Sequence, residues 1–169
     1  MVNAVEVFNS LPTERVTADL LACCAAPTWA AAVAAGRPYP GLAELIRTAD
    51  AAARALSWAD VAGALAAHPR IGERVSGDAR EAVWSRREQA GAANADEATK
   101  AALVAANREY EERFGHVFLI FASGRTDAEM LAAARQRLGN DESIERLIVA
   151  EELRRIALLR LERLIDGLN

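Results

Sequence analysis

Two short motifs in this chain bring together residue types that could transfer a proton. The first, His68-Pro69-Arg70-Ile71-Gly72-Glu73, holds one of the two histidines, and the second, Ser85-Arg86-Arg87-Glu88-Gln89-Ala90-Gly91, follows after one short segment. The proline after His68 disfavours a helical backbone there, so the histidine is expected at a helix end. Histidine changes protonation near neutral pH, and Glu88 close to it would orient the imidazole or accept its proton. The two residues are the candidate catalytic pair.

The second motif is expected on a helix with three functional groups on one face. Residues three and four positions apart share a helix face, so Ser85, Glu88 and Gln89 would project together. A hydroxyl, a carboxylate and an amide in fixed directions suit a small, nitrogen-rich substrate. A solvated polar face has the same pattern, and the spacing alone leaves both interpretations open.

Arg160 interrupts an apolar stripe near the end of the chain. Val149, Leu153, Ile156 and Leu164 recur at helical spacing, and Arg160 falls where a core residue would be expected. A guanidinium that points inward requires an anionic partner, either an internal carboxylate or a bound ligand.

No metal or cofactor is predicted. His116, the second histidine, is far from His68 in the sequence and no cysteine cluster accompanies them, so His116 is given a structural role. The three tryptophans are expected in the core, and glycine patterns of nucleotide or phosphate loops are absent. Cys23 and Cys24 are adjacent, which would strain a disulfide, so both are expected to pack as small apolar side chains.

The composition predicts one soluble domain over residues 1–169. With 169 residues, 52% of them hydrophobic, the chain can bury a core of its own. A net charge of −4 argues against nucleic acid as a partner. No basic leader and no apolar run near the roughly 20 residues of a membrane span are present, so no membrane is expected and the protein is expected in the cytoplasm.

Apolar residues at helical spacing and abundant alanine predict an all-α, compact bundle of about eight helices. Ser57 with Asp60, and Thr126 with Glu129, match the capping-box spacing at a helix start. The expected helices span Ala18 to Ala25, Trp29 to Ala35, Gly41 to Leu56, Trp58 to Ala67, Asp78 to Ala90, Ala98 to Phe114, Ala128 to Leu138 and Ser143 to Ile165.

Two interruptions separate these helices. One runs from Pro69 to Gly77 directly after His68, and the other runs from Gly115 to Arg125 and holds an apolar stretch flanked by glycines. That stretch could be a buried extended segment or the continuation of a helix past Gly115. If it is extended, its backbone groups need partners, which a polar, planar ligand or neighbouring helix ends and water could supply.

These motifs resemble the 2-oxo-4-hydroxy-4-carboxy-5-ureidoimidazoline (OHCU) decarboxylase family. His-Pro-Arg-Ile-Gly followed by Ser-x-x-Glu-Gln-Ala-Gly carries the resemblance most specifically, and further similar stretches extend it over nearly the whole chain. These are Phe8-Asn9-Ser10-Leu11-Pro12, Cys23-Cys24, Trp29, Arg37-Pro38-Tyr39, Asn107-Arg108-Glu109-Tyr110 through Gly115, Phe118 to Arg125, and Glu152 to Leu161.

The resemblance implies a decarboxylase that needs no cofactor and forms (S)-allantoin from a ureidoimidazoline during urate degradation. His68 matches the catalytic histidine, taken as the proton donor, and Glu88 matches the second catalytic group. The remaining matches imply contacts with the small-molecule substrate, at Pro69, Ser85, Arg86, Arg87, Gln89, Leu119, Ile120, Phe121, Ala122, Ser123 and Arg160. The resemblance also implies a homodimer.

Two other classes of function remain open. A related pocket could hydrolyse a different ureide with Glu88 activating water, which would release ammonia or urea instead of carbon dioxide. Alternatively, the chain could be a non-catalytic helical binding protein in which His68-Pro69 only terminates a helix.

Overall fold

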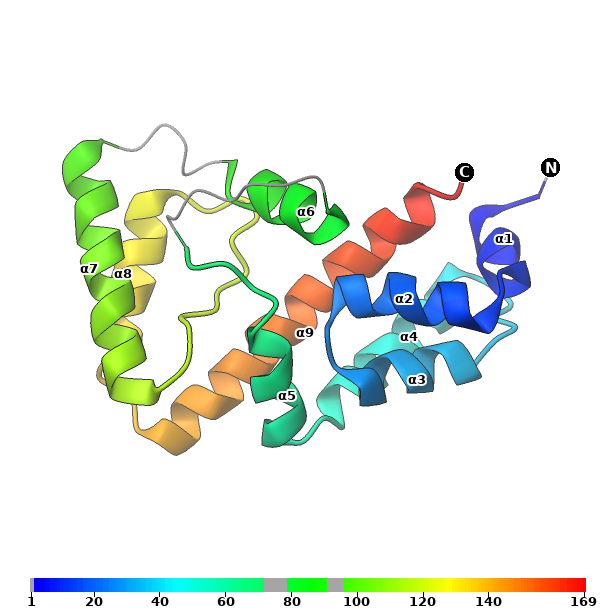
Figure 1. Cartoon of the computed structure of the whole chain (residues 1–169), viewed down its shortest axis with the longest axis horizontal. Helices are drawn as coiled ribbons and strands as arrows, with labels where there is room; N and C mark the ends of the chain where they lie inside the picture. The colour runs from blue at the N-terminus through cyan, green and yellow to red at the C-terminus, as the bar shows by residue number, and fades with distance from the viewer. Residues whose placement is uncertain (1, 72–78, 91–95) are drawn as a thin grey trace. The chain divides into compact units, whose positions relative to one another are not determined.

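The structure is a computed structural model that describes residues 2–71, 79–90 and 96–169. Over these ranges the chain forms nine α-helices and no β-strand, which confirms the all-α prediction (Figure 1). The fold divides into two compact units, one of residues 1–64 with 153–169 and one of residues 65–152. Within the described ranges, no helix combines the length and apolar character needed to cross a bilayer.

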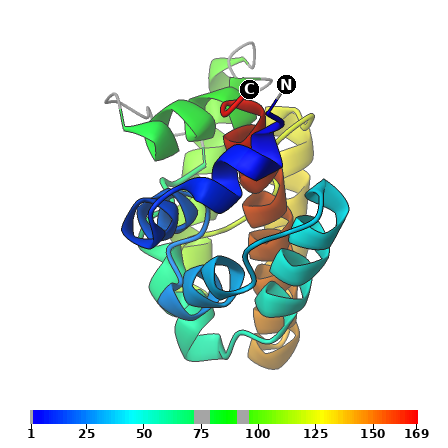
Figure 2. The same ribbon diagram turned by 90° about the vertical axis from the view of Figure 1, so that its right-hand side faces the viewer.

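The first unit contains the amino-terminal helices and the end of the last helix. The helices are α1 (Ala4–Ser10), α2 (Thr13–Cys23), α3 (Pro27–Ala35), α4 (Leu42–Arg54), α5 (Trp58–Leu65) up to Ala64, and α9 (Glu142–Asp166) from Leu153 onward. Helix α3 packs against both α2 and α4 (Figure 2). Trp29 is fully buried, and its indole N–H donates to the Ala49 carbonyl at 3.0 Å, so this tryptophan is a core residue as expected.

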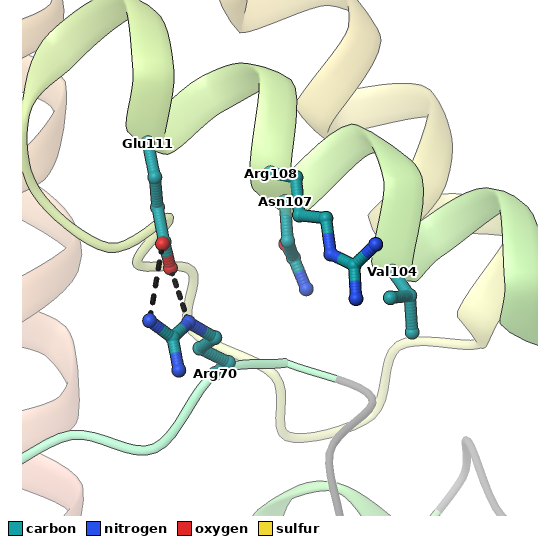
Figure 3. Close-up of a pocket in the computed structure, with 5 residues that line it drawn as sticks. All are labelled: Arg70, Val104, Asn107, Arg108 and Glu111. Carbon is teal, nitrogen blue, oxygen red and sulfur yellow. Dashed lines mark hydrogen bonds and ion pairs between the residues drawn. The ribbon is translucent and has the colours of Figure 1, made fainter.

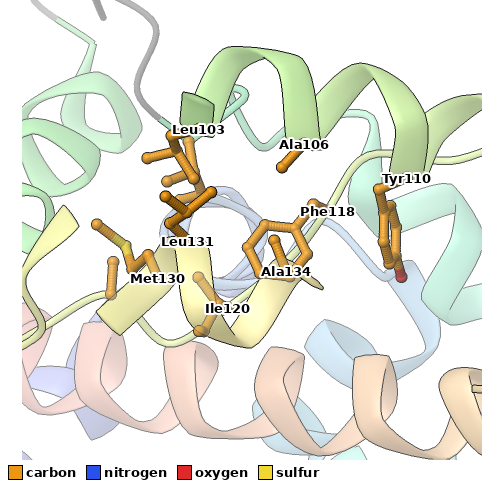
Figure 4. Close-up of a cluster of buried hydrophobic side chains, with 10 residues drawn as sticks. Leu103, Ala106, Tyr110, Phe118, Ile120, Met130, Leu131 and Ala134 are labelled. Carbon is orange, nitrogen blue, oxygen red and sulfur yellow. The ribbon is translucent and has the colours of Figure 1, made fainter. Parts of the chain in front are cut away.

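The second unit contains α6 (Arg80–Glu88), α7 (Glu97–Phe114), α8 (Asp127–Arg137) and the first part of α9. Helices α7 and α8 pack against each other, and the apolar side chains between them form one buried cluster (Figure 4). This cluster, called the α7–α8 core below, consists of Ile71, Leu103, Ala106, Tyr110, Phe118, Ile120, Ala122, Met130, Leu131 and Ala134.

The helix starts follow local capping chemistry. Thr126 and Glu129 form the predicted capping box, and the Ser57 hydroxyl likewise accepts from the Asp60 N–H at 3.2 Å. Helix α1 was not predicted because it has only seven residues, and a third capping box between Asn3 and Glu6 starts it. Helix α2 begins at Thr13 and not at Ala18, with Pro12 at its N-cap position.

The segment after α7 is extended, not helical. Gly115 adopts a left-handed conformation with φ 77°, which ends α7 because residues with a Cβ rarely tolerate it. The following residues carry no helix, and Phe118, Leu119, Ile120 and Ala122 are buried. Of the other predicted interruption, only Pro69 to Ile71 lie within the described residues.

Candidate active site

His68 lies just past α5, on the turn that leaves the helix. Its backbone N–H donates to the carbonyl of Leu65, the last residue of α5, at 3.0 Å. The side chains of His68 and Pro69 are half-buried. The expected position at a helix end is therefore correct, although α5 ends at Leu65 and not at Ala67.

Helix α6 directs the polar groups of the second motif inward. Ser85 and Glu88 are 3% and 7% exposed, and Gln89, at the C-cap, is half-buried. The neighbouring side chains of Arg86 and Arg87 are exposed. The face that carries Ser85 and Glu88 is thus buried, which rules out the alternative of a solvated polar face.

A cavity of about 310 Å³ brings the two motifs together. Its lining includes His68, Pro69 and Ser85, and also Glu81, one turn before Ser85 on α6. The alanines at positions 66, 67, 79 and 82 complete the lining, so polar groups share the cavity with small apolar side chains. Imidazole, hydroxyl and carboxylate groups around one cavity of this size can orient a small polar molecule and exchange protons with it.

Three carbonyl groups of the extended segment accept hydrogen bonds from arginines. Arg137 donates to the Leu119 carbonyl at 2.7 Å, and Arg125 donates to the carbonyls of Phe121 and Ala122 at 2.9 and 3.0 Å. Within the described residues, no hydrogen bond is donated by the backbone N–H groups from Leu119 to Gly124. Backbone N–H groups of a loop can donate to an oxygen of a bound ligand.

A buried ion pair holds this segment in place. Arg137 and Glu145 are 6% and 0% exposed; Arg137 Nε donates to Glu145 Oε1 at 2.7 Å, and Nη2 lies 2.6 Å from the same oxygen. The Tyr110 hydroxyl also donates to Oε1 at 2.6 Å, while the Asn140 amide donates to Oε2 at 3.0 Å. Burial and the adjacent Glu145 carboxylate both raise the pKa of Tyr110, so this phenol remains a neutral donor.

The extended segment and the His68 segment share one apolar cluster. Ile71, three residues beyond His68, lies in the α7–α8 core together with Phe118, Ile120 and Ala122 of the extended segment. Both candidate segments are therefore fixed to the same part of the second unit.

Arg160 belongs to the first unit and is buried, as its place in the apolar stripe predicted. Cys24 is in the same unit; burial raises the pKa of its thiol to about 11, and the positive charge of Arg160 opposes this effect. The assignment of Arg160 to the substrate site remains a prediction.

The His116 side chain packs against aromatic residues. Its Nδ1 lies 3.1 Å from the Val117 carbonyl, and its ring stacks on Phe114 and meets the edge of Tyr110. In the part of the chain that the structure describes, no group of three or more histidine, cysteine or acidic residues is placed to hold a metal ion. These contacts support the structural role expected for His116.

The sequence interpretation missed three residues in these arrangements. Glu81 follows the signal already used for Ser85, since it lies four residues before it on the same helix. Arg137 had no distinct signal, because an arginine in the last turn of a helix is usually exposed. Asn107 is buried, and its amide donates to the Ile71 carbonyl. The only sequence signal for it was its position in a stretch that resembles the family.

The all-helical fold is that of a class of small helical enzymes. A family model described as OHCU decarboxylase matches residues 9–162, and the chain belongs to that family. The structure is similar to a solved structure described as OHCU decarboxylase in the presence of (S)-allantoin, with a TM-score of 0.73 and 31% identity, covering 88% of this chain and 97% of the other.

Two curated relatives extend the comparison. A 2-oxo-4-hydroxy-4-carboxy-5-ureidoimidazoline decarboxylase from Amia calva is 33% identical over 142 residues, which cover 83% of this chain and 81% of the relative. The uric acid degradation bifunctional protein TTL from Arabidopsis thaliana is 31% identical over 85% of this chain, and the match spans 45% of that protein. A structure described as (S)-allantoin synthase, at 18% identity and a TM-score of 0.72, shares the fold.

Proposed function

We propose that this protein is a carboxy-lyase that converts 2-oxo-4-hydroxy-4-carboxy-5-ureidoimidazoline into (S)-allantoin during urate degradation. The names of its relatives support this reaction, and the observation that carries it is the cavity lined by His68, Pro69 and Ser85. The same cavity adjoins the helix on which Glu88 is buried.

The substrate supplies its own electron sink. When the bond to the carboxylate carbon breaks, carbon dioxide leaves and the electron pair enters the adjacent carbon–nitrogen double bond. The resulting enol then takes up one proton at the carbon that bears the ureido group, and its hydroxyl proton is transferred to the ring nitrogen that received the electron pair, as the ring carbonyl forms. The protein orients the substrate, stabilises its charge and delivers the proton to one face, and no cofactor is required.

His68 donates this proton, and Glu88 acts as its catalytic partner. An imidazole can both donate and accept a proton, which suits a group that must give up a proton and recover it in each cycle. Glu88 holds the substrate hydroxyl or a ring nitrogen and keeps the imidazole protonated. Placing the donor on one side of the cavity accounts for a single enantiomer.

The remaining predicted residues bind the substrate. Pro69, Ser85 and Gln89 contact the ring and ureido group, and the exposed positions of Arg86 and Arg87 limit those two to the edge of the site. The backbone N–H groups of the Leu119–Ser123 segment suit the substrate's oxygen atoms, and side chains of Arg137 and Arg125 hold this segment through the carbonyls of Leu119 and Phe121. Arg160 is proposed to bind polar oxygen atoms of the substrate.

We also propose that residues 1–169 act as one domain, and that the protein is a homodimer in the cytoplasm. Two buried free cysteines, Cys23 and Cys24, are consistent with a reducing compartment. Size-exclusion chromatography with light scattering tests the dimer.

The deciding experiment generates the unstable substrate from urate with uricase and hydroxyisourate hydrolase and follows (S)-allantoin by circular dichroism. The parent protein should give fast, enantiopure product, and His68→Asn should reduce the rate to the slow racemic background. His116→Asn is the matched control, since it removes the other histidine from a packing site and should retain activity.

Three outcomes would contradict the proposal. A parent protein that only reproduces the racemic background is not this decarboxylase. Release of ammonia or urea without carbon dioxide would indicate a hydrolase instead. Full activity in His68→Asn would remove the histidine from the mechanism.

A further inference from the structure

The three residues after His68 are anchored to α7 by two separate interactions. The Asn107 side-chain amide donates to the Ile71 carbonyl, and Arg70 forms a two-pronged ion pair with Glu111, with Nε–Oε1 and Nη2–Oε2 distances of 2.6 and 3.2 Å. Figure 3 shows Asn107 and Glu111 projecting from the same side of α7 toward the segment that carries Arg70. Asn107 and Glu111 are four residues apart, so they share one face of the helix.

The two anchors differ in how deeply they are buried. Asn107 is 3% exposed and Ile71 is 5% exposed, so their hydrogen bond lies inside the protein. The side chains of Arg70 and Glu111 are 50% and 24% exposed, and an ion pair at that depth contributes little to stability. The ion pair instead fixes the orientation of the Arg70 side chain, because a planar guanidinium that contacts both carboxylate oxygens is held in one orientation.

We propose that Asn107, Arg70 and Glu111 are positioning residues that fix the His68 imidazole for proton delivery. His68 is two residues before Arg70 and three before Ile71, and its own N–H is bound on the other side to the Leu65 carbonyl. The turn that carries the imidazole is therefore held at both ends. A shift of about 1 Å in a catalytic group can lower a rate by about 100-fold, so these anchors matter more for rate than for stability.

The kinetic part of this inference rests on the decarboxylase proposed above, while its structural part can be tested without any substrate. The chain has two histidines, so its imidazole Cε1–H groups give two NMR signals, assigned with His68→Asn and His116→Asn. Replacing Asn107 by Leu removes the donor at similar volume. It should shift or broaden the His68 signal, lower kcat by about 10- to 100-fold, and leave KM within about twofold.

The ion pair is tested by reversal and rescue. Glu111→Arg places two cations together and should lower kcat and shift the His68 signal, with little change in melting temperature because the pair is partly exposed. Adding Arg70→Glu restores an opposite-charge pair and should recover most of both effects. A merely structural role for Glu111 would not produce this recovery in the His68 signal.

Arg108 provides the matched control. It lines the same cavity of about 240 Å³ as Arg70, Asn107 and Glu111, it is exposed, and its side chain makes no hydrogen bond or ion pair with side chains of other described residues. Arg108→Gln removes the same charge and should leave both kcat and the His68 signal unchanged. An effect as large as that of Glu111→Arg would show that the charge of this surface matters and not the anchoring of Arg70, which would overturn the proposal.

The outcomes separate the two proposals. If the parent protein has no decarboxylase activity, the proposed function fails, and the His68 signal alone decides whether the anchors fix the imidazole. If the parent is active, but the folded Asn107→Leu and Glu111→Arg variants keep its kcat and its His68 signal, the positioning role is wrong. If Asn107→Leu does not fold, Glu111→Arg and its rescue by Arg70→Glu decide the question.

Discussion

Replacing Arg137 by Met removes the cation from a deeply buried ion pair. In the parent, the Arg137 guanidinium contacts the Glu145 carboxylate and the Leu119 carbonyl, and its Cζ atom lies 4.6 Å from the centre of the Phe118 ring. Methionine can fill much of the space beside Phe118, but it donates no hydrogen bond. The change therefore isolates the loss of the charge and its donors.

The expected cost follows from what remains around Glu145. After the substitution, this fully buried carboxylate keeps only two neutral donors, the Tyr110 hydroxyl and the Asn140 amide. Removing one partner of a buried ion pair typically costs about 3–5 kcal/mol, because the remaining charge is uncompensated. We expect a loss of about 4 kcal/mol in the free energy of unfolding, or a melting temperature about 8–16 °C lower in a chain of this size.

Urea denaturation followed by circular dichroism measures this loss, with Arg146→Met as the matched control. Arg146 pairs with Glu142 at 2.7 Å, but the two side chains are 44% and 64% exposed, so the control should cost about 1 kcal/mol or less. Replacing both buried partners, Arg137→Met with Glu145→Leu, should recover much of the stability. The reasoning is refuted if Arg137→Met costs no more than Arg146→Met.

The remaining predictions concern three other sites. Neither Cys23 nor Cys24 should react with a thiol reagent at pH 8 in the native protein, and both should react after unfolding, since both are buried and the pKa of Cys24 is about 11. Burial raises the pKa of Asp127, so the stability it contributes is present below the unfolded pKa of about 4 and is lost as pH rises through the folded pKa. Urea titrations should show Asp127→Asn gaining stability relative to the parent from about pH 4 to pH 7; an unchanged difference would contradict the shift. Arg37→Lys should lower the free energy of unfolding by about 1–3 kcal/mol, because one ammonium cannot replace both Nη1, which donates to the Leu11 carbonyl at 2.7 Å, and Nη2, which donates to the Thr13 hydroxyl at 3.1 Å; equal stability by thermal denaturation would show that one ammonium suffices.

Local signals predicted most of the helices. The start of α7 was predicted to within one residue, because the helical spacing of its apolar residues continues over a long segment. Its end was predicted because Gly115, which adopts a left-handed conformation, follows it. The start of α8 was predicted by Thr126 and Glu129, whose capping box needs no distant partner. Helix α1 was missed because seven residues contain too few turns to show a period.

The candidate site was predictable only where one helix carries the residues. The spacing of Ser85 and Glu88 placed them on one face, and α6 buries that face. The role of Arg137 depends on Glu145, which lies on another helix, and on the Leu119 carbonyl, eighteen residues earlier in the chain. Such a contact exists only in the folded chain, and no periodicity in the sequence shows it.

One turn of α7 carries Asn107, Tyr110 and Glu111, and this crowding makes the helix unevenly tolerant of substitution. Asn107 and Glu111 bind the segment after His68, while Tyr110 binds the Glu145 carboxylate that holds Arg137 and, through it, the extended segment. A substitution at any of these three residues therefore disturbs one segment or the other. The exposed positions 109 and 112, between and beside these residues, can vary without disturbing either segment, so variation among functional descendants of this chain should concentrate there.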